Sequence, residues 1–328
     1  MIPAPQPITF TPLFVPKPWG GGRLATLLNK HLPPDEPIGE SWELVSLPGH
    51  ESRVRDGPFA GRTLGELVAA WGPDLLGAAD LADGRFPLLV KFLDACQNLS
   101  VQVHPKPVGD PHAAQTGVKH EAWYVLHADP GARLYIGLKP GVTADDVARA
   151  ADTPAIAELL HAWDARPGDC FYLPSGTLHA LGAGLVVAEV QTPSDVTYRA
   201  YDWDRVDSAG RPRTLHVAEA LANIRYDVTA EMIRPQPEQV PGAGPTRATR
   251  VASCPRFMLD VLEAPTGQSW PIPPGRVRIW IILAGGGRFS TGGAFRCGDV
   301  ALLPAASTSC DVTLAADTRW LEVTIPPA

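Results

Sequence analysis

The sequence predicts a mainly β fold with two barrels of the jelly-roll type and short helical segments inserted in and after the first barrel. Two observations support this prediction. The 328 residues include 35 Pro and 31 Gly spread along the chain, with 45% hydrophobic residues, which is typical of a turn-rich β protein with a substantial core. In addition, two segments of the C-terminal part match two segments of the first part in the same order.

The matching segments contain the same turn and strand signals. The stretch "EAWYVL" at 121–126 aligns with "RIWIIL" at 278–283, and "GDCFYLPSGTLH" at 168–179 aligns with "GDVALLPAASTS" at 298–309. A Gly-Asp turn, a hydrophobic strand and a following Pro form a repeating unit of antiparallel jelly-roll barrels. We therefore expect one domain with helical inserts over residues 1–240 and a second barrel over residues 241–328.

The N-terminal part carries many turn signals before its first periodic segment. Residues 1–60 are expected to be rich in loops, because Gly punctuates the stretches "KPWGGGRL" and "IGESWELVSLPG". Residues 61–82 then place Leu64, Leu67 and Trp71 on one face at helical spacing. This segment predicts a helix.

Short apolar or alternating segments predict the strands of the first barrel. The run "FPLLVKFLDA" has flanking turn signals, as a core strand does. The expected strands are 86–95, 99–105, 119–128 and 132–138. Residues 143–163 follow as a helical insert, with Thr143 as its N-cap.

The same criteria continue to the C-terminus. Strands are expected at 168–192 and 197–204, and residues 213–224 have the spacing of a helix. The Pro- and Gly-rich segment 234–250 is the best linker candidate. Strands are expected to dominate the remainder.

The charge and cysteine content narrow the function classes. The chain has 28 Lys plus Arg against 35 Asp plus Glu, a net charge of −7 with no basic block. This balance argues against nucleic acid and anionic membrane surfaces as partners. Five cysteines without a CxxC pair, and a start without a signal peptide, favour reduced thiols and a cytoplasmic location. No feature of the sequence predicts the oligomeric state.

The stretch "LSVQVHP" at 99–105 has one polar face, formed by Ser100, Gln102 and His104. We expect this face to look into a site rather than into solvent. Inward faces of small barrels lie close together, so Gln102 and His104 can meet Glu121 and His179. Two imidazoles, one carboxylate and one amide oxygen suit a divalent ion of the zinc type.

Each of these four residues also has an ordinary structural interpretation. His104 before Pro105 could be an exposed histidine at a strand end, and Glu121 could be solvated at a strand start. The repeat favours the metal site, because Arg278 and Ser309 stand where the first copy has Glu121 and His179. The candidate ligand residues Glu121 and His179 occur only in the first copy, whereas both copies have the turn residues and the core tryptophan.

Four further charged residues lie in strand-like contexts: Lys91, Lys119, Glu189 and Arg199. A buried lysine needs an anionic partner, so Lys91 predicts either a structural ion pair or a site residue. Lys119 shares strand parity with Glu121, although it could also be an exposed lysine. Glu189 and Arg199 lie ten residues apart and could form an ordinary cross-strand ion pair.

The stretches "KPWGG", "GESWE", "PLLVKFLDA", "LSVQVHP", "KHEAWYVL", "GDCFYLPSGTLHALG" and "TYRAYDWDR" resemble type I mannose-6-phosphate isomerases of the short bacterial branch, in the cupin superfamily. The resemblance runs from about residue 12 to residue 225. It implies an isomerase that interconverts mannose 6-phosphate and fructose 6-phosphate with one zinc ion per chain. The implied zinc ligands are Gln102, His104, Glu121 and His179.

The resemblance also assigns roles around the metal. It implies Lys91, Ser100 and Arg205 as substrate-binding residues and Lys119, Glu189 and Arg199 as catalytic residues. Arg205 stands where the longer branch has a lysine, so its phosphate contact is the weakest of these assignments. The implied reaction is proton transfer through a cis-enediol, for which we select Glu189 as the acid and base.

Two alternatives stay open from the sequence. An oxygen-dependent cupin enzyme would favour a set of histidines and a carboxylate, and Gln102 argues against it. A non-catalytic cupin that contains a metal and binds a sugar or sugar phosphate would keep the barrels, but it could lose Lys119, Glu189 or Arg199. All three are present.

Overall fold

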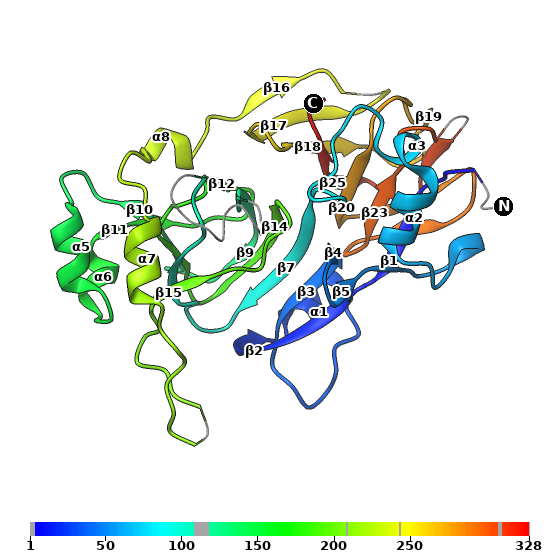
Figure 1. The fold of residues 1–328 in the computed structure, drawn as a ribbon. Helices are drawn as coiled ribbons and strands as arrows, with labels where there is room; N and C mark the ends of the chain where they lie inside the picture. The colour runs from blue at the N-terminus through cyan, green and yellow to red at the C-terminus, as the bar shows by residue number, and fades with distance from the viewer. Residues whose placement is uncertain (1–3, 108–117, 208, 243, 308–309, 328) are drawn as a thin grey trace.

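The first barrel consists of two antiparallel sheets (Figure 1). The computed structural model describes residues 4–107, 118–207, 209–242, 244–307 and 310–327. The six-stranded sheet has the order β12 (Cys170–Leu173), β9 (Glu121–Ala128), β14 (Leu185–Gln191), β7 (Leu89–Ala95), β3 (Ile38–Leu44) and β2 (Leu13–Gly21). The five-stranded sheet has the order β11 (Leu160–Asp164), β10 (Arg133–Leu138), β13 (His179–Leu181), β8 (Val101–Val103) and β15 (Tyr198–Tyr201).

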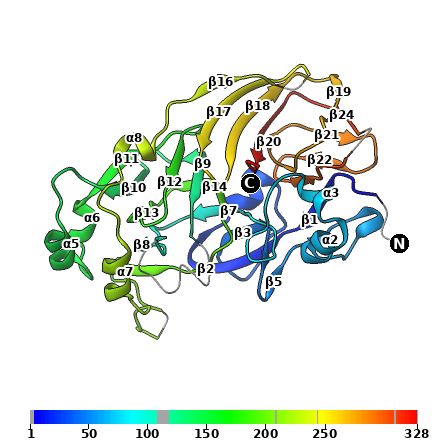
Figure 2. The ribbon, with the colours of Figure 1, turned by 45° about the horizontal axis from the view of Figure 1, so that its top comes forward.

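The second barrel also has two sheets (Figure 2). Its eight-stranded sheet has the order β16 (Glu238–Val240), β17 (Arg247–Ser253), β18 (Met258–Ala264), β25 (Thr318–Thr324), β20 (Arg278–Ala284), β23 (Val300–Leu303), β1 (Ile8–Thr11) and β6 (Arg53–Val54). Its four-stranded sheet has the order β19 (Ser269–Pro271), β24 (Asp311–Leu314), β21 (Gly286–Phe289) and β22 (Ala294–Arg296). A two-stranded ribbon joins β4 (Ser46–Leu47) to β5 (His50–Glu51). Strand β1 pairs with β23, so the N-terminal strand lies in the sheet of the C-terminal residues.

The internal repeat has the same strand register in both barrels. Strand β9 pairs with β12 with Trp123 opposite Phe171, and β20 pairs with β23 with Trp280 opposite Ala301. The Gly-Asp turn makes the same pair of backbone hydrogen bonds in each copy, to Val125 in the first and to Ile282 in the second. The repeat that predicted two barrels is therefore confirmed over these strands. Ser309, the last residue of the second copy, lies outside the described residues.

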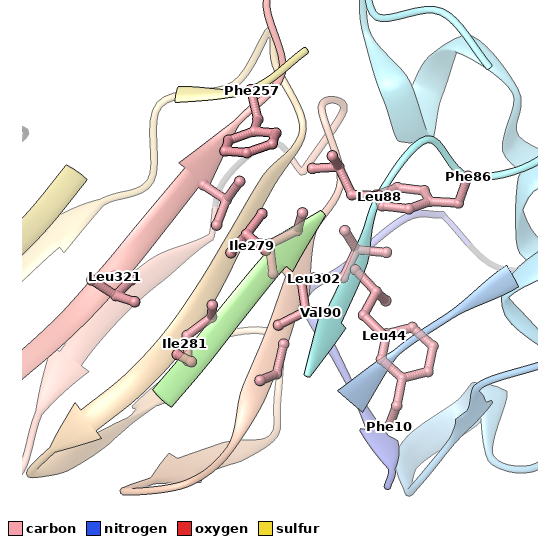
Figure 3. Close-up of a cluster of buried hydrophobic side chains, with 14 of the residues drawn as sticks. Phe10, Leu44, Phe86, Leu88, Val90, Phe257, Ile279, Ile281, Leu302 and Leu321 are labelled. Atoms are coloured by element: carbon pink, nitrogen blue, oxygen red, sulfur yellow. The ribbon is translucent and has the colours of Figure 1, made fainter. Parts of the chain in front are cut away.

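Alternation along the central strands separates two cores. On β9, Trp123 and Val125 face the interior of the first barrel, whereas Tyr124 belongs to a cluster between the barrels. Figure 3 shows this second cluster, to which Val90 from β7 and Ile281 from β20 both belong. The two large sheets thus pack face to face, and the remaining face of each sheet closes its own barrel.

The helices are short and lie outside the barrels. They are α1 (Arg23–Leu28), the 3₁₀ turn η1 (Gly57–Phe59), α2 (Leu64–Trp71), α3 (Pro73–Leu76), α5 (Ala144–Ala150), α6 (Ala155–Glu158), α7 (Val217–Asn223) and α8 (Ala230–Ile233). The predicted face of α2 is buried, and Thr63 and Glu66 form a capping box at its N-terminus. Thr143 caps α5 as predicted. None of the helices in the described part of the chain is long and apolar enough to cross a membrane.

Three local predictions were wrong. Residues 38–44 form the buried strand β3 instead of a loop, because Lys17 pairs with Glu40 and Lys30 pairs with Glu43, so the carboxylates of this segment are not solvated. The helical insert ends early, and Leu160–Asp164 is strand β11, which pairs with β10. The linker candidate contains strand β16 and the start of β17, which pair with each other. The predicted class, a mainly β fold with two barrels and short helical segments, is confirmed.

Candidate active site

A polar cavity lies in the first barrel between its two sheets. Most of the residues singled out from the sequence line it: Lys91, Ser100, Gln102, Lys119, Glu121, Glu189 and Arg199. His104 and His179 are buried beside it and contact Glu121. Arg205 is not among its lining residues. The polar face of "LSVQVHP" therefore looks into a cavity, as predicted.

Strand register brings the charged residues of the six-stranded sheet together. Glu189 on β14 lies opposite Lys91 on β7 and opposite Trp123 on β9. Gln191 on β14 lies opposite Glu121 on β9, two residues along on the same face. The shared parity directs Lys91, Glu121 and Glu189 into the barrel interior, away from the core between the barrels.

The five-stranded sheet supplies the facing residues. His179 on β13 and Arg199 on β15 both lie opposite Gln102 on β8. His104 follows β8 directly, where Pro105 removes a backbone donor and ends the pairing. Two sheets thus contribute to one site.

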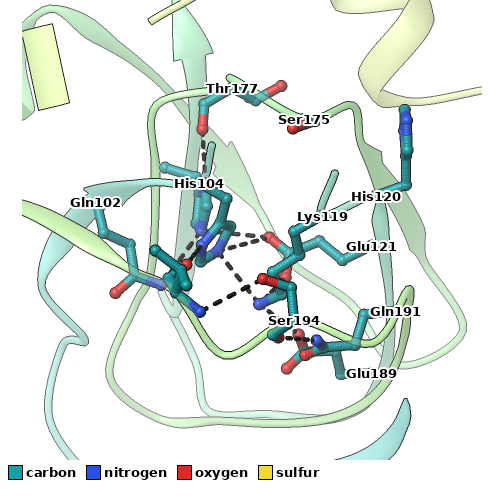
Figure 4. A network of polar contacts seen from close by, with 12 residues as sticks. Gln102, His104, Lys119, His120, Glu121, Ser175, Thr177, Glu189, Gln191 and Ser194 are labelled. Carbon is teal, nitrogen blue, oxygen red and sulfur yellow. Dashed lines mark hydrogen bonds and ion pairs between the residues drawn. The ribbon is translucent and has the colours of Figure 1, made fainter. Parts of the chain in front are cut away.

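Three ligand atoms converge at the centre of the site. One oxygen of Glu121, Oε1, lies 3.5 Å from Nε2 of His104 and 3.3 Å from Nε2 of His179. The three side chains are almost fully buried, and their candidate ligand atoms all lie within 4.8 Å of one another. Figure 4 shows Glu121, His104 and Lys119 pointing toward one another.

The hydrogen bonds of the two histidines fix which ring nitrogen carries a lone pair. Nδ1 of His104 lies 2.8 Å from the Val196 carbonyl oxygen, and Nδ1 of His179 lies 2.8 Å from the Thr177 carbonyl oxygen. A carbonyl only accepts, so Nδ1 carries the proton in each ring and Nε2 keeps its lone pair; Nε2 of His104 also lies 3.2 Å from the Lys119 ammonium, which donates to it. This orientation by backbone carbonyls is the usual arrangement of histidines that bind metals.

The protonation states leave three acceptors facing one another. Burial lowers the pKa of His104, and it lowers the pKa of His179 to about 4. Burial alone would raise the pKa of Glu121, but the charge of Lys119 holds it well below its ordinary value. Two neutral imidazole lone pairs and a carboxylate oxygen that accepts no hydrogen bond therefore converge. Such a group fits a divalent metal ion.

The structure places Gln102 beside this group but turns its amide nitrogen toward it. Nε2 of Gln102 lies 3.4 Å from Nε2 of His179, while Oε1 accepts a hydrogen bond from the Ser100 hydroxyl at 3.0 Å. As a metal ligand, Gln102 would have to present its oxygen instead, which requires rotation of the amide. His104, Glu121 and His179 form the group that could hold a metal ion, and Gln102 flanks it.

Lys119 bridges two carboxylates. Its Nζ lies 2.7 Å from Glu121 and 3.2 Å from Glu189, and all three groups are buried. Burial raises the pKa of Glu189 to about 7, with Lys119 and Lys91 opposing the increase and the charge of Glu121 adding to it. Burial would lower the pKa of Lys119, but the two carboxylates raise it above its ordinary value. The surroundings of Glu189 therefore favour its protonated form more than water does.

Lys91 has the anionic partner that its burial requires. Its Nζ lies 3.5 Å from Glu40 and 4.5 Å from the ring centre of Trp42. Lys17 also pairs with Glu40, at 3.0 Å, and the Trp42 indole donates to the same carboxylate at 2.6 Å. Glu40 therefore fixes Lys91 at the cavity wall. A second carboxylate, Asp195, lies 3.9 Å from Nζ of Lys91.

The arginines divide into two groups. Arg199 lines the cavity and donates to the Thr214 carbonyl at 2.8 Å, while Glu189 pairs with Lys119, so the structure does not bring Arg199 and Glu189 together as an ion pair. Arg205 instead pairs with Asp202 at 3.1 Å. The same aspartate holds Arg213, which lines the cavity beside Arg199.

Sequence reasoning missed several residues of the cavity wall: Lys17, Trp19, Glu40, Asp195 and Arg213. For Glu40, the available signal was a carboxylate within a stretch that also contains Trp42 and alternates as a strand does. The turn residues of "KPWGG" concealed the strand β2 that carries Lys17 and Trp19. Arg213 had no local signal, because it precedes a helix and reaches the cavity only through the fold.

Comparisons with known proteins agree with this geometry. Residues 9–128 match the family model described as phosphomannose isomerase type I, catalytic domain. The chain is 36% identical over 236 residues to mannose-6-phosphate isomerase ManA of Bacillus subtilis, covering 72% of this chain and 73% of that protein. It is 39% identical over 206 residues to the mannose-6-phosphate isomerase of Streptococcus mutans, covering 62% and 63% of the two chains.

A solved structure extends the likeness to both barrels. The crystal structure of mannose 6-phosphate isomerase from Bacillus subtilis superimposes with a TM-score of 0.85 and 29% identity. The superposition covers 98% of this chain and 100% of that chain. The chain therefore belongs to the type I phosphomannose isomerases, a family of enzymes.

Proposed function

We propose that this protein interconverts mannose 6-phosphate and fructose 6-phosphate. The observation that carries the proposal is the convergence of His104, Glu121 and His179 beside Lys119 and Glu189 in one cavity. This set combines a candidate metal group, which can stabilise a developing oxyanion, with a carboxylate that can transfer a proton, and an aldose–ketose isomerase can use both. The names of the relatives, mannose-6-phosphate isomerases, support mannose 6-phosphate as the substrate.

We propose zinc as the metal, with one ion per chain. Two imidazole nitrogens and one carboxylate oxygen are donors that zinc accepts, and Gln102 can add its amide oxygen after rotation of the side chain. When bound, zinc supplies positive charge that stabilises an oxygen on which negative charge develops. The chain holds one such group in its described residues.

The proposed proton transfer relies on Glu189. The reaction moves a proton from C2 of the aldose to C1 of the ketose through a cis-enediol, so one base can remove it and return it on the same face of the sugar. Glu189 has the raised pKa that suits both roles. Lys119, held between Glu121 and Glu189, keeps a positive charge next to the reacting oxygens and supports the enediolate.

The remaining residues are proposed to hold the substrate. The cavity has a volume of about 80 Å³, which accommodates the reacting end of a sugar but not a whole hexose phosphate. The phosphate end therefore extends toward the less buried arginines, Arg199 and Arg213. Lys91 and Ser100 face the sugar hydroxyls. Arg205 is proposed to act indirectly: it binds Asp202, and Asp202 also binds Arg213, which lines the cavity.

The direct test is conversion of mannose 6-phosphate by the purified protein, followed as fructose 6-phosphate formed over time. Protein treated with a chelator should lose activity, and added zinc should restore it. Binding of mannose 6-phosphate without any fructose 6-phosphate, in protein that contains one zinc ion, would instead support a non-catalytic sugar phosphate-binding protein.

A further inference from the structure

A second polar pocket lies on the second barrel. It has a volume of about 420 Å³, within the range of small-molecule sites. Its charged lining residues are Arg250, Asp260, Arg276, Arg278 and Glu322. None of them belongs to the candidate active site.

Strand register shows that this pocket is the counterpart of the active-site cavity. Glu322 on β25 lies opposite Trp280 on β20, as Glu189 on β14 lies opposite Trp123 on β9. The two strands that carry the carboxylates are central in their sheets and follow the same order of neighbours, β7-β14-β9 in the first barrel and β18-β25-β20 in the second. Glu322 therefore occupies the position of Glu189.

The next strand extends the correspondence. Asp260 on β18 lies opposite Glu322, as Lys91 on β7 lies opposite Glu189. Two residues further along, Leu262 and Leu93 line their respective pockets. Strands β17 and β18, side by side in Figure 2, thus form the same wall as β3 and β7 in the first barrel.

The charge at the centre is reversed between the two pockets. Arg278 stands at the register position of Glu121, because Arg278 lies opposite Leu303 as Glu121 lies opposite Leu173. A carboxylate at this place suits a cation, whereas a guanidinium repels one and attracts an anion. The second pocket therefore has no place for the metal.

One guanidinium of the pocket remains available. Arg250 binds Asp260 through two hydrogen bonds of 2.8 and 3.0 Å, and Arg278 lies 3.7 Å from Glu322. Arg276 is exposed and has no carboxylate partner in the described part of the chain. Three arginines against two carboxylates leave the pocket with net positive charge.

We propose that this pocket binds a small phosphate monoester that carries hydroxyl groups, such as a sugar phosphate. The planar fork of Arg276 suits a phosphate group, and Arg278 lines the same pocket and adds positive charge. Asp260 and Glu322 accept hydrogen bonds from hydroxyls of the same ligand. The proposal does not depend on the isomerase activity, since its residues lie on the other barrel.

The test is a calorimetric titration of the zinc-loaded full chain with fructose 6-phosphate. Arg276→Ala should bind one molecule fewer per chain than the unmodified protein, or bind that molecule at least about tenfold more weakly. Arg288→Ala is the matched control, because Arg288 is an exposed arginine of the same barrel outside the pocket. This variant should bind the same number of molecules as the unmodified protein.

Two further probes identify the ligand chemistry. Inorganic phosphate should compete for the site that Arg276→Ala removes, and it should bind more weakly than the sugar phosphate. Fructose should not compete. Equal binding of fructose 6-phosphate by the unmodified protein and Arg276→Ala would overturn the proposal. Displacement of fructose 6-phosphate by fructose, in a buffer without inorganic phosphate, would also overturn it. Because the readout is a difference between two variants, it stays valid if the protein proves to have no isomerase activity.

Discussion

Glu121 and Arg278 occupy the same register position in the two barrels. Each begins a central strand two residues before a tryptophan, and each lies opposite a leucine of the neighbouring strand. This exchange of a carboxylate for a guanidinium, together with Ser309 at the sequence position of His179, distinguishes a barrel with a candidate metal group from one whose pocket is lined by arginines. The scaffold is shared, and the chemistry follows from the side chains placed on it.

His179→Ala should reduce the bound zinc from about one ion per chain to a small fraction of that. The substitution removes one of the converging ligand atoms, and the remaining set is too small for a stable site. His161→Ala is the control, since His161 lies on β11 outside the site. Elemental analysis after dialysis measures the metal, and full zinc content in His179→Ala would exclude this histidine as a ligand.

Glu189→Gln should keep the metal and the fold but lower turnover by about 10²-fold or more. The amide has nearly the same shape, yet it cannot accept the C2 proton. Glu263→Gln, at a half-exposed carboxylate of the second barrel, should have unchanged turnover. Steady-state kinetics on mannose 6-phosphate provide the measurement. Turnover of the Glu189→Gln protein within a factor of two of the unmodified protein would assign the base to another group.

Arg199→Ala should lower kcat/KM for mannose 6-phosphate by about 10- to 10⁴-fold. The change removes one or two charge-assisted hydrogen bonds to phosphate, at roughly 1.5–3 kcal/mol each. Activity on unphosphorylated mannose should fall much less, and Arg211→Ala, an exposed arginine nearby, should have no effect. Equal losses on both sugars would place Arg199 at the reacting carbons rather than at the phosphate.

Glu40 should make the fold sensitive to acid. Burial alone would raise its pKa, but Lys91, Lys17 and the Trp42 indole lower it to about 2, below the ordinary value of 4.5. The stabilisation is therefore complete above about pH 4.5 and is lost as the pH falls toward 2, and it amounts to roughly 3 kcal/mol.

Urea unfolding of metal-free protein at several pH values tests this contribution. The free energy of unfolding of Glu40→Gln should lie about 3 kcal/mol below that of the unmodified protein at pH 7, and the gap should narrow as the pH falls. Glu36→Gln, at an exposed carboxylate, should show no gap. A gap of constant size from pH 7 to pH 3 would show that Glu40 stabilises the fold by packing and not by charge.

The sequence predicted those parts of the fold whose signals are local or repeated. Short stretches of sequence were enough to predict three features. These are the helical face of Leu64 and Leu67, the cap at Thr143 and the two matching Gly-Asp turns. Strand β3 was not predicted, because its carboxylates are buried through ion pairs with Lys17, Lys30 and Lys91, which lie on other elements. Tertiary ion pairs decided that segment, and no local pattern reports them.

The site shows the same division. Ser100, Gln102 and His104 were predicted as one polar face from strand alternation, and the structure places them at the cavity. Arg213 could not be predicted, since only Asp202 holds it beside Arg199. The orientation of the Gln102 amide could not be predicted either, because a sequence shows residue types but not which amide atom faces the site.

The central claim is that this chain isomerises mannose 6-phosphate by proton transfer at the Glu189 site. The most direct test is NMR of the reaction in deuterated water with zinc-loaded protein. The account predicts fructose 6-phosphate that carries solvent deuterium at C1, and formation of this product at least about 10² times more slowly by Glu189→Gln. Fructose 6-phosphate formed without any deuterium, at the same rate by both proteins, would contradict it.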